Sequence, residues 1–183
     1  MDLSTKWHDT HHHRMMSICD SPLTQVALSD LDPDHPAVKF DRVWQFLSET
    51  GHIPSRTALG IDQIPFALKW IMLFEAIGAG SEKRYRLRLQ GSGAAQLTNG
   101  DLTGQYLDEF TRNDCYQSRH QAFEMATAQR KPIFADISVE SAQNNGEFRV
   151  DVSAGIFPFL MKTHAEQIIV VVAPPLSIRK IMH

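Results

Sequence analysis

Cysteine is scarce in this sequence of 183 residues, which contains only Cys19 and Cys115. Two cysteines this far apart do not make a disulfide framework, and no segment has the charged start, apolar centre and small-residue end of a secretory leader. Long hydrophobic runs are also missing, because the longest, at residues 168–173, is far shorter than the roughly 20 residues of a membrane helix. We therefore expect a cytoplasmic protein with no membrane partner.

An excess of charge of one sign is absent as well. The 18 Lys and Arg and the 21 Asp and Glu give a formal net charge of -3, and the basic residues are spread along the chain instead of forming a block. Proteins that bind nucleic acids concentrate basic residues into a patch. We therefore expect no nucleic-acid partner.

Hydrophobic residues make up 43% of the chain and charged residues 21%, which is typical of a folded globular protein. The length suits one domain with tails. We place a domain at residues 34–173, after an N-terminal tail at residues 1–33 and before a C-terminal tail at residues 174–183. The N-terminal tail is expected to be largely irregular, apart from one short strand or turn at residues 24–28.

The first half of this domain predicts one helix and two strands. A helix at residues 36–50 begins at Pro36 and ends before Gly51. An apolar strand follows at residues 68–77, and the next strand, at residues 84–89, alternates arginine with apolar residues. We expect Arg84, Arg86 and Arg88 on one face of that strand and Tyr85, Leu87 and Leu89 on the other. The sequence favours a solvated arginine face paired with carboxylates of neighbouring strands, and a site for a phosphate or carboxylate is the alternative.

The second half predicts a longer helix and three strands. The predicted elements are an irregular or short helical piece at residues 93–110, a helix at 114–129, a hairpin of strands at 133–140 and 148–157 joined by Asn144–Gly146, and a strand at 168–173. This order indicates an α+β domain with a five-stranded antiparallel sheet, helices on one face and an N-terminal helix.

Several short pieces of this pattern are similar to one known family. They are Trp44, Ile53–Arg56, Leu73–Glu75, Tyr85–Leu87, Gly100–Gly104 and Phe157–Leu160. Over residues 44–173 the chain resembles the stand-alone bacterial PAS domains, which are short single-domain proteins. The resemblance implies a PAS-like fold, a sensory or protein-interaction role, frequent dimerisation and no catalytic set of residues. We therefore do not expect an enzyme.

Aromatic residues are the main clue to a ligand site, because small-molecule pockets are mostly apolar with a few polar groups. A cavity between the sheet and the helices is one interpretation of these rings, and a core that they simply fill is the other. The expected ligand-binding residues are Phe74, Tyr106, Phe110, Tyr116, His120, Phe123, Phe134 and Phe148, and Phe157 is a further aromatic residue of this kind.

Two residues raise the question of a cofactor. His120 shares a helix face with Tyr116 and Phe123, and haem-binding PAS domains carry an iron-ligating His on the corresponding helix. Cys115 resembles the reactive thiol of flavin-binding PAS domains, although Asp114 separates it from Asn113. The sequence favours a core histidine and a packed cysteine, so the cofactor stays unknown and no metal site is expected.

The expected partners are a small molecule, a signalling protein, or both. A homodimer through helix 36–50 is predicted because this helix carries Trp44 and Phe46. The first functional hypothesis is a PAS-type sensor that acts through another protein, and the second is a ligand-free interaction scaffold. The third is an enzyme that uses His120 as a base near Asp108.

Overall fold

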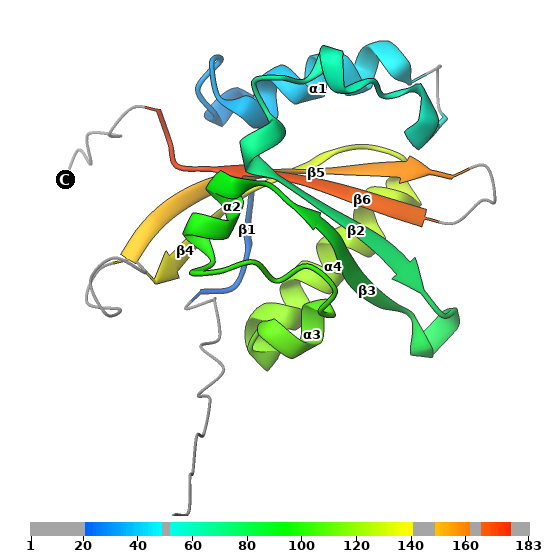
Figure 1. The fold of residues 1–183 in the computed structure, drawn as a ribbon, viewed down its shortest axis with the longest axis vertical. Helices are drawn as coiled ribbons and strands as arrows, with labels where there is room; N and C mark the ends of the chain where they lie inside the picture. Colours follow the sequence, from blue (N-terminus) through cyan, green and yellow to red (C-terminus); the bar gives the residue numbers. More distant parts are fainter. Residues whose placement is uncertain (1–20, 49–51, 141–148, 162–165, 177–183) are drawn as a thin grey trace, which may run out of the picture.

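The computed structural model describes residues 21–48, 52–140, 149–161 and 166–176 (Figure 1). These residues form one six-stranded sheet with the order β1-β4-β5-β6-β2-β3, in which every pair of neighbours is antiparallel. The strands are β1 (Thr24–Val26), β2 (Ile71–Ile77), β3 (Arg84–Gln90), β4 (Ile133–Glu140), β5 (Arg149–Leu160) and β6 (Glu166–Ala173).

Within the described residues, four α-helices accompany the sheet: α1 (Pro36–Leu47), α2 (Ser92–Leu97), α3 (Leu107–Phe110) and α4 (Asn113–Gln129). Short 3-10 turns occur at Leu28–Asp30, Arg56–Ala58, Ile61–Gln63, Leu68–Trp70 and Gly80–Glu82. The helix that the sequence predicts at 36–50 thus ends at Leu47, while residues 49–51 lie outside the described part of the chain. The expected turn at 144–146 and Phe148 also lie outside it.

The α+β class and the antiparallel sheet are confirmed, but the sheet has one strand more than the sequence predicts. The additional strand is β1, which pairs with the edge of β4 from Thr24 opposite Asp136 to Val26 opposite Phe134. It lies within the expected N-terminal tail, at residues 24–28, where the sequence indicates a short strand or turn. Pairing there satisfies backbone groups of β4 that would otherwise face outward.

Strand β5 continues through Pro158, beyond its predicted end at residue 157. Proline lacks an N–H group, so within a sheet it is confined to positions where that donor is not needed. The pairing of β5 with β4 stops at Ile156 opposite Ile133, whereas its pairing with β6 continues to Leu160. One side of β5 is therefore no longer paired with a neighbouring strand where Pro158 occurs.

Helix α1 covers one face of the sheet and lies across β5 and β6 in Figure 1. Its Trp44 is only 2% exposed and donates from Nε1 to the Pro158 carbonyl oxygen at 2.9 Å. Gly155 permits this approach, because a Cβ there would lie 3.0 Å from the Cβ of Ala37. Apolar residues of α1 and the 3-10 turns pack here against strand residues that face α1, such as Phe157, and together they form a hydrophobic core.

His35 fastens the start of α1 to the end of β6. Its ring is buried, with Nδ1 accepting from the Ala37 N–H and Nε2 lying 3.2 Å from the Ala173 carbonyl oxygen. A carbonyl can only accept and an N–H can only donate, so the ring is neutral with its proton on Nε2. Burial lowers the pKa of His35 below its ordinary 6.5, although the bond to Ala173 acts in the opposite direction.

This environment predicts a loss of stability in acid. Below pH 6.5 the unfolded chain binds a proton at His35 that the folded chain does not, so the free energy of unfolding falls as the pH drops towards the lowered folded pKa. The slope contributed by this group is at most about 1.4 kcal/mol per pH unit. His35→Asn should be less stable at pH 8 but show a flatter pH profile in urea denaturation. An unchanged profile would show that His35 titrates alike in both states.

Helices α2, α3 and α4 cover the opposite face of the sheet (Figure 1). Because side chains alternate along a strand, Ala154 and Ile156 of β5 face α4 while Phe157 and Phe159 face α1. Helix α4 ends with Arg130 in the left-handed conformation, where its N–H reaches back to Ala126 and Thr127. The sheet is thus the middle layer of three.

Candidate functional site

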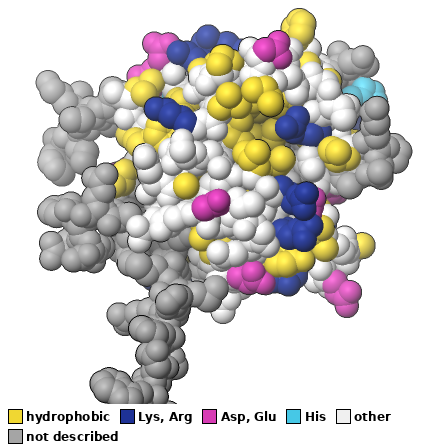
Figure 2. Space-filling view, viewed as in Figure 1, with side chains coloured by type: hydrophobic (Ala, Val, Ile, Leu, Met, Phe, Trp, Pro, Cys, Tyr) yellow, Lys and Arg dark blue, Asp and Glu magenta, His cyan; other side chains and the backbone are white. Residues whose placement is uncertain are grey.

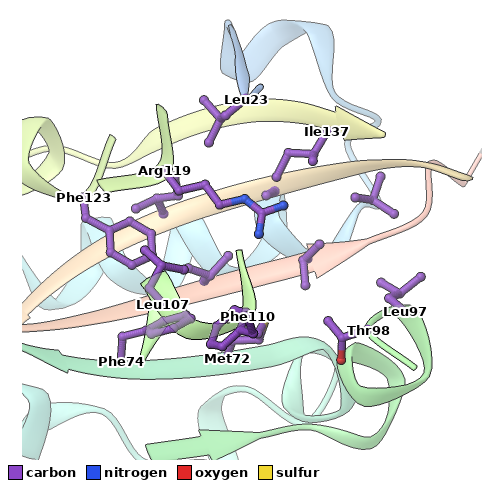
Figure 3. A pocket seen from close by; sticks show the side chains of 15 residues that line it. Leu23, Met72, Phe74, Leu97, Thr98, Leu107, Phe110, Arg119, Phe123 and Ile137 are labelled. Atoms are coloured by element: carbon purple, nitrogen blue, oxygen red, sulfur yellow. The ribbon is translucent and has the colours of Figure 1, made fainter. Parts of the chain in front are cut away.

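A cavity of about 60 Å³ lies between the sheet and the helices α2, α3 and α4 (Figure 3). Its walls come from both ends of the domain sequence and from the N-terminal segment. The lining residues are Leu23, Met72, Phe74, Leu97, Thr98, Leu107, Phe110, Arg119, Phe123, Ile137, Val152, Ala154, Ile156, Val170 and Val172.

The floor of the cavity includes alternate residues of the neighbouring strands β5 and β6. Val152, Ala154 and Ile156 of β5 are two residues apart, so their side chains point to the same face, as do those of Val170 and Val172 on β6. Ala154 is fully buried, and its single methyl group leaves space above the middle of β5. The apolar run that predicted a buried strand at 168–173 therefore also supplies part of this floor.

The roof comes from the helices, and two further segments supply the rim. Phe123 of α4 approaches Phe74 of β2 with ring centroids 5.2 Å apart, and Phe110 of α3 lies 6.4 Å from Phe74. Ile137 of β4 and Leu23, just before β1, close the edge. The backbone N–H of Leu23 donates to Ser118 Oγ on α4, which fixes this edge to the roof.

Among the described residues, the lining contains two polar side chains, Thr98 and Arg119. The hydroxyl of Thr98 accepts from Gln90 Nε2 at 2.7 Å and lies within 2.9 Å of the Gly100 carbonyl oxygen and 3.1 Å of that of Ala94. It is therefore occupied by the protein itself. Arg119 differs, because its Nε is buried without a hydrogen-bond partner within the described part of the chain.

Three of the expected ligand residues line the cavity, namely Phe74, Phe110 and Phe123. The structure places four others elsewhere. Tyr106 lies under the guanidinium of Arg84 at 3.9 Å, Tyr116 and His120 lie together with ring centroids 5.4 Å apart, and Phe134 belongs to the core beneath α1, as does Phe157.

His120 directly follows Arg119 in α4 but belongs to a separate cluster of polar groups outside the cavity lining. Its Nε2 lies 3.4 Å from the Lys83 carbonyl oxygen, and its ring packs against Tyr85. Lys83 forms ion pairs with Glu124 at 2.8 Å and Glu166 at 2.9 Å, and the Tyr85 hydroxyl donates to Glu124 at 2.6 Å. This cluster links β3, α4 and β6.

The pKa directions in this cluster follow from burial and pairing. Burial opposes charge on both Lys83 and Glu124, but their hydrogen bonds outweigh it, so the pKa of Lys83 is raised and that of Glu124 is lowered. Burial raises the pKa of Tyr85, and its bond to Glu124 adds to the effect. All three groups therefore keep the protonation states that pair best, which is typical of a structural network.

The three arginines of β3 pair with carboxylates, as the sequence indicates. Arg84 binds Asp108 at 2.9 Å, and Arg86 and Arg88 approach Glu75 on β2. The two residues combined in the enzyme hypothesis therefore have different partners: Asp108 pairs with Arg84, and His120 contacts the Lys83 backbone.

The prediction for Leu89 is wrong. Tyr85 and Leu87 are buried beside α4, but a register shift between Leu73 and Phe74 leaves Leu89 opposite Leu73. Residues directly opposite each other share a face, so Leu89 lies on the α1 side of the sheet, where it is 50% exposed.

Cys115 is fully buried in α4 and does not line the cavity. Within residues 21–48, 52–140, 149–161 and 166–176, no three His, Cys, Asp or Glu side chains are grouped so as to hold a metal ion. Within the same ranges, none of the helices combines the length and apolarity needed to cross a membrane.

Arg119 is the residue of this site that the sequence prediction missed. It lies four residues after Cys115 and four before Phe123, which places all three on one face of α4. Cys115 and Phe123 are 0% and 3% exposed, so that face is the buried one. An arginine within the apolar stripe of a helix was the available signal.

Comparison with known proteins adds no assignment to this geometry. No protein-family model matches the chain, and no curated protein matches its sequence.

Proposed function

We propose that this chain is a cytoplasmic PAS-type sensory module that holds a small molecule in the cavity and passes the signal to another protein. The succession of elements supports the resemblance: after α1 come two strands, short helices, the long helix α4 and three strands. That is the order in which the sequence predicted the elements of a PAS-like domain. The three-residue strand β1 is an addition to that pattern.

The observation that carries the proposal is the cavity itself. Protein interiors are close-packed, and spaces larger than a water molecule are few in a domain of this size. Here a space of about 60 Å³ is lined almost entirely by apolar side chains, which come from the sheet and from the helices α2, α3 and α4 on one side of it. Binding pockets for small molecules have this composition.

The cavity also offers a route for a signal. Leu23 lines it and is followed at once by β1, which is held to β4 over only three residue pairs. A ligand that packs better against Leu23 when β1 is paired would shift the population towards the paired state. A partner protein that binds the N-terminal segment then distinguishes the paired from the unpaired state of β1.

Pairing of two copies through α1 is part of the same proposal. Trp44 takes no part in it, because it is buried against the chain's own sheet, but Phe46 on the outer side of α1 is 82% exposed. Figure 2 shows an apolar patch with Lys and Arg side chains beside it on the side of the molecule facing the viewer. A second copy of the chain is the occupant that we propose for the exposed apolar side chains.

Native mass spectrometry of freshly purified protein tests these points together. We expect a species with two chains and an additional small-molecule mass that is lost when the protein is unfolded. A clean polypeptide mass, retained after incubation with small apolar compounds, would favour the alternative of a ligand-free scaffold. A single-chain species at micromolar concentration would remove the dimer from the proposal.

A further inference from the structure

We propose that the ligand of the cavity is a small monocarboxylate, with its apolar body against the sheet and its carboxylate held by Arg119. This inference rests on the proposed function and names the chemical class of the ligand. Its basis is the juxtaposition of an apolar cavity with a guanidinium whose buried Nε has no hydrogen-bond partner among the described residues.

Arg119 is positioned by α4 and points into the cavity. Figure 3 shows its guanidinium group between Ile137 and the helix residues Leu107 and Phe110. Its Nε is buried without a hydrogen-bond partner, and no carboxylate within the described residues forms an ion pair with it. The arginines of β3 differ in this respect, since Arg84, Arg86 and Arg88 each meet a carboxylate.

Arg119 is partly buried, and its fully buried Nε has no hydrogen-bond partner in the described part of the chain, which is unfavourable because the guanidinium stays charged and this donor has lost its hydration. Buried polar groups in folded proteins nearly always have partners, so an exception calls for a specific explanation. The explanation that we infer is that the ligand itself supplies the hydrogen-bond acceptor for Arg119. The protein without ligand is then less stable by the cost of this unpartnered donor, and the ligand removes that cost when it binds.

The chemistry of the site selects a carboxylate. The donors of a guanidinium lie in a fixed planar fork that matches the two oxygens of a carboxylate. Phosphate carries more charge than Arg119 balances, and Arg119 is the one basic side chain among the described lining residues. A second carboxylate on the ligand would lie among apolar walls. An amine would be repelled by Arg119, and the Thr98 hydroxyl is already engaged with Gln90 and the backbone.

The volume limits the size of the ligand. A single water needs about 10–15 Å³ of such space, so about 60 Å³ accommodates on the order of four to six groups of that size. Because bonded atoms are closer together than waters, this corresponds to an acid of about four to eight carbon atoms. The rings of Phe74, Phe110 and Phe123 suit a branched chain or a single aromatic ring.

The test is titration of the full chain with four probes of similar shape: benzoate and 4-methylpentanoate, neutral benzyl alcohol, and cationic benzylamine. Binding is followed by NMR of the methyl groups of Leu23, Ile137, Val152 and Val170, which line the cavity. We expect a carboxylate to bind at least about tenfold more tightly than benzyl alcohol, because hydrogen bonds to a charged partner are the stronger ones. Benzylamine should not bind.

Two matched variants separate recognition from a structural role. Arg119→Met keeps most of the side-chain length, so it should abolish the preference for carboxylates while leaving the melting temperature without ligand unchanged or higher. Arg42→Met removes an exposed arginine of α1, beyond the opposite face of the sheet, and should change neither property. A marked fall in the melting temperature of Arg119→Met, with the carboxylate preference intact, would overturn the inference.

The outcomes also distinguish this inference from the proposed function. Binding of benzyl alcohol in the cavity, at an affinity equal to or better than that of both carboxylates, would leave the small-molecule site in place and overturn the carboxylate assignment. Failure of every probe to shift the cavity methyl groups would overturn both.

Discussion

Replacing Trp44 with alanine is expected to lower the free energy of unfolding by about 3–5 kcal/mol, the range measured when a large aromatic side chain is removed from a core. Trp44 is 2% exposed and fills the space between α1 and the sheet. Its Nε1 also donates to the carbonyl oxygen of Pro158, in a part of β5 that is not paired with β4. The variant therefore leaves both a cavity and a buried carbonyl without its donor. Urea denaturation followed by circular dichroism measures the difference.

Phe46→Ala is the matched control for this result. Phe46 lies two residues further along the same helix but is 82% exposed. Its replacement should change the stability of the monomer by no more than about 0.5 kcal/mol, as is usual for surface positions. Equal losses for Trp44→Ala and Phe46→Ala would contradict the orientation of α1 described above.

The second large effect is expected at Ala135, on the face of the sheet that carries the cavity. Ala135 of β4 and Ala154 of β5 lie directly opposite each other, and both are 0% exposed. Ala154 lines the cavity, whereas Ala135 does not. Leucine at position 135 has no space to occupy and should lower the free energy of unfolding by about 1–3 kcal/mol, the usual cost of overpacking a core.

Leucine at position 154 should have a different effect, because its additional carbon atoms enter the existing space. We expect Ala154→Leu to stay within about 1 kcal/mol of the wild type, a margin smaller than typical overpacking costs. It should also lose the small-molecule mass in native mass spectrometry. Similar destabilisation by both substitutions in thermal and urea denaturation would show that the space above β5 is filled.

Local patterns account for most of the elements. Pro36 at the first turn and the spacing of the apolar residues predicted α1, and the alternation along residues 84–88 predicted which residues of β3 turn towards the core. The apolar run at 168–173 predicted a buried strand, which is β6 between β5 and β2. These predictions succeeded because helical and strand periods are properties of the backbone geometry of neighbouring residues.

Other features depend on which segments meet. The face of Leu89 depends on the register shift in the pairing of β2 with β3, and the place of β1 depends on the free edge of β4. Neither pairing leaves a trace in the local sequence period, because each is determined by a segment far away in the chain.

The site divides in the same way. The sequence by itself determined that α4 has a buried face and that Phe74, Phe110 and Phe123 are apolar residues of regular elements. Only the tertiary structure decided that these three rings share one cavity while Phe134 lies on the other side of the sheet. It also decided that Arg119 lines that cavity, with a buried Nε that has no hydrogen-bond partner among the described residues. The physical reason is that a period fixes which side chains share a face, whereas the packing of distant segments decides what that face meets.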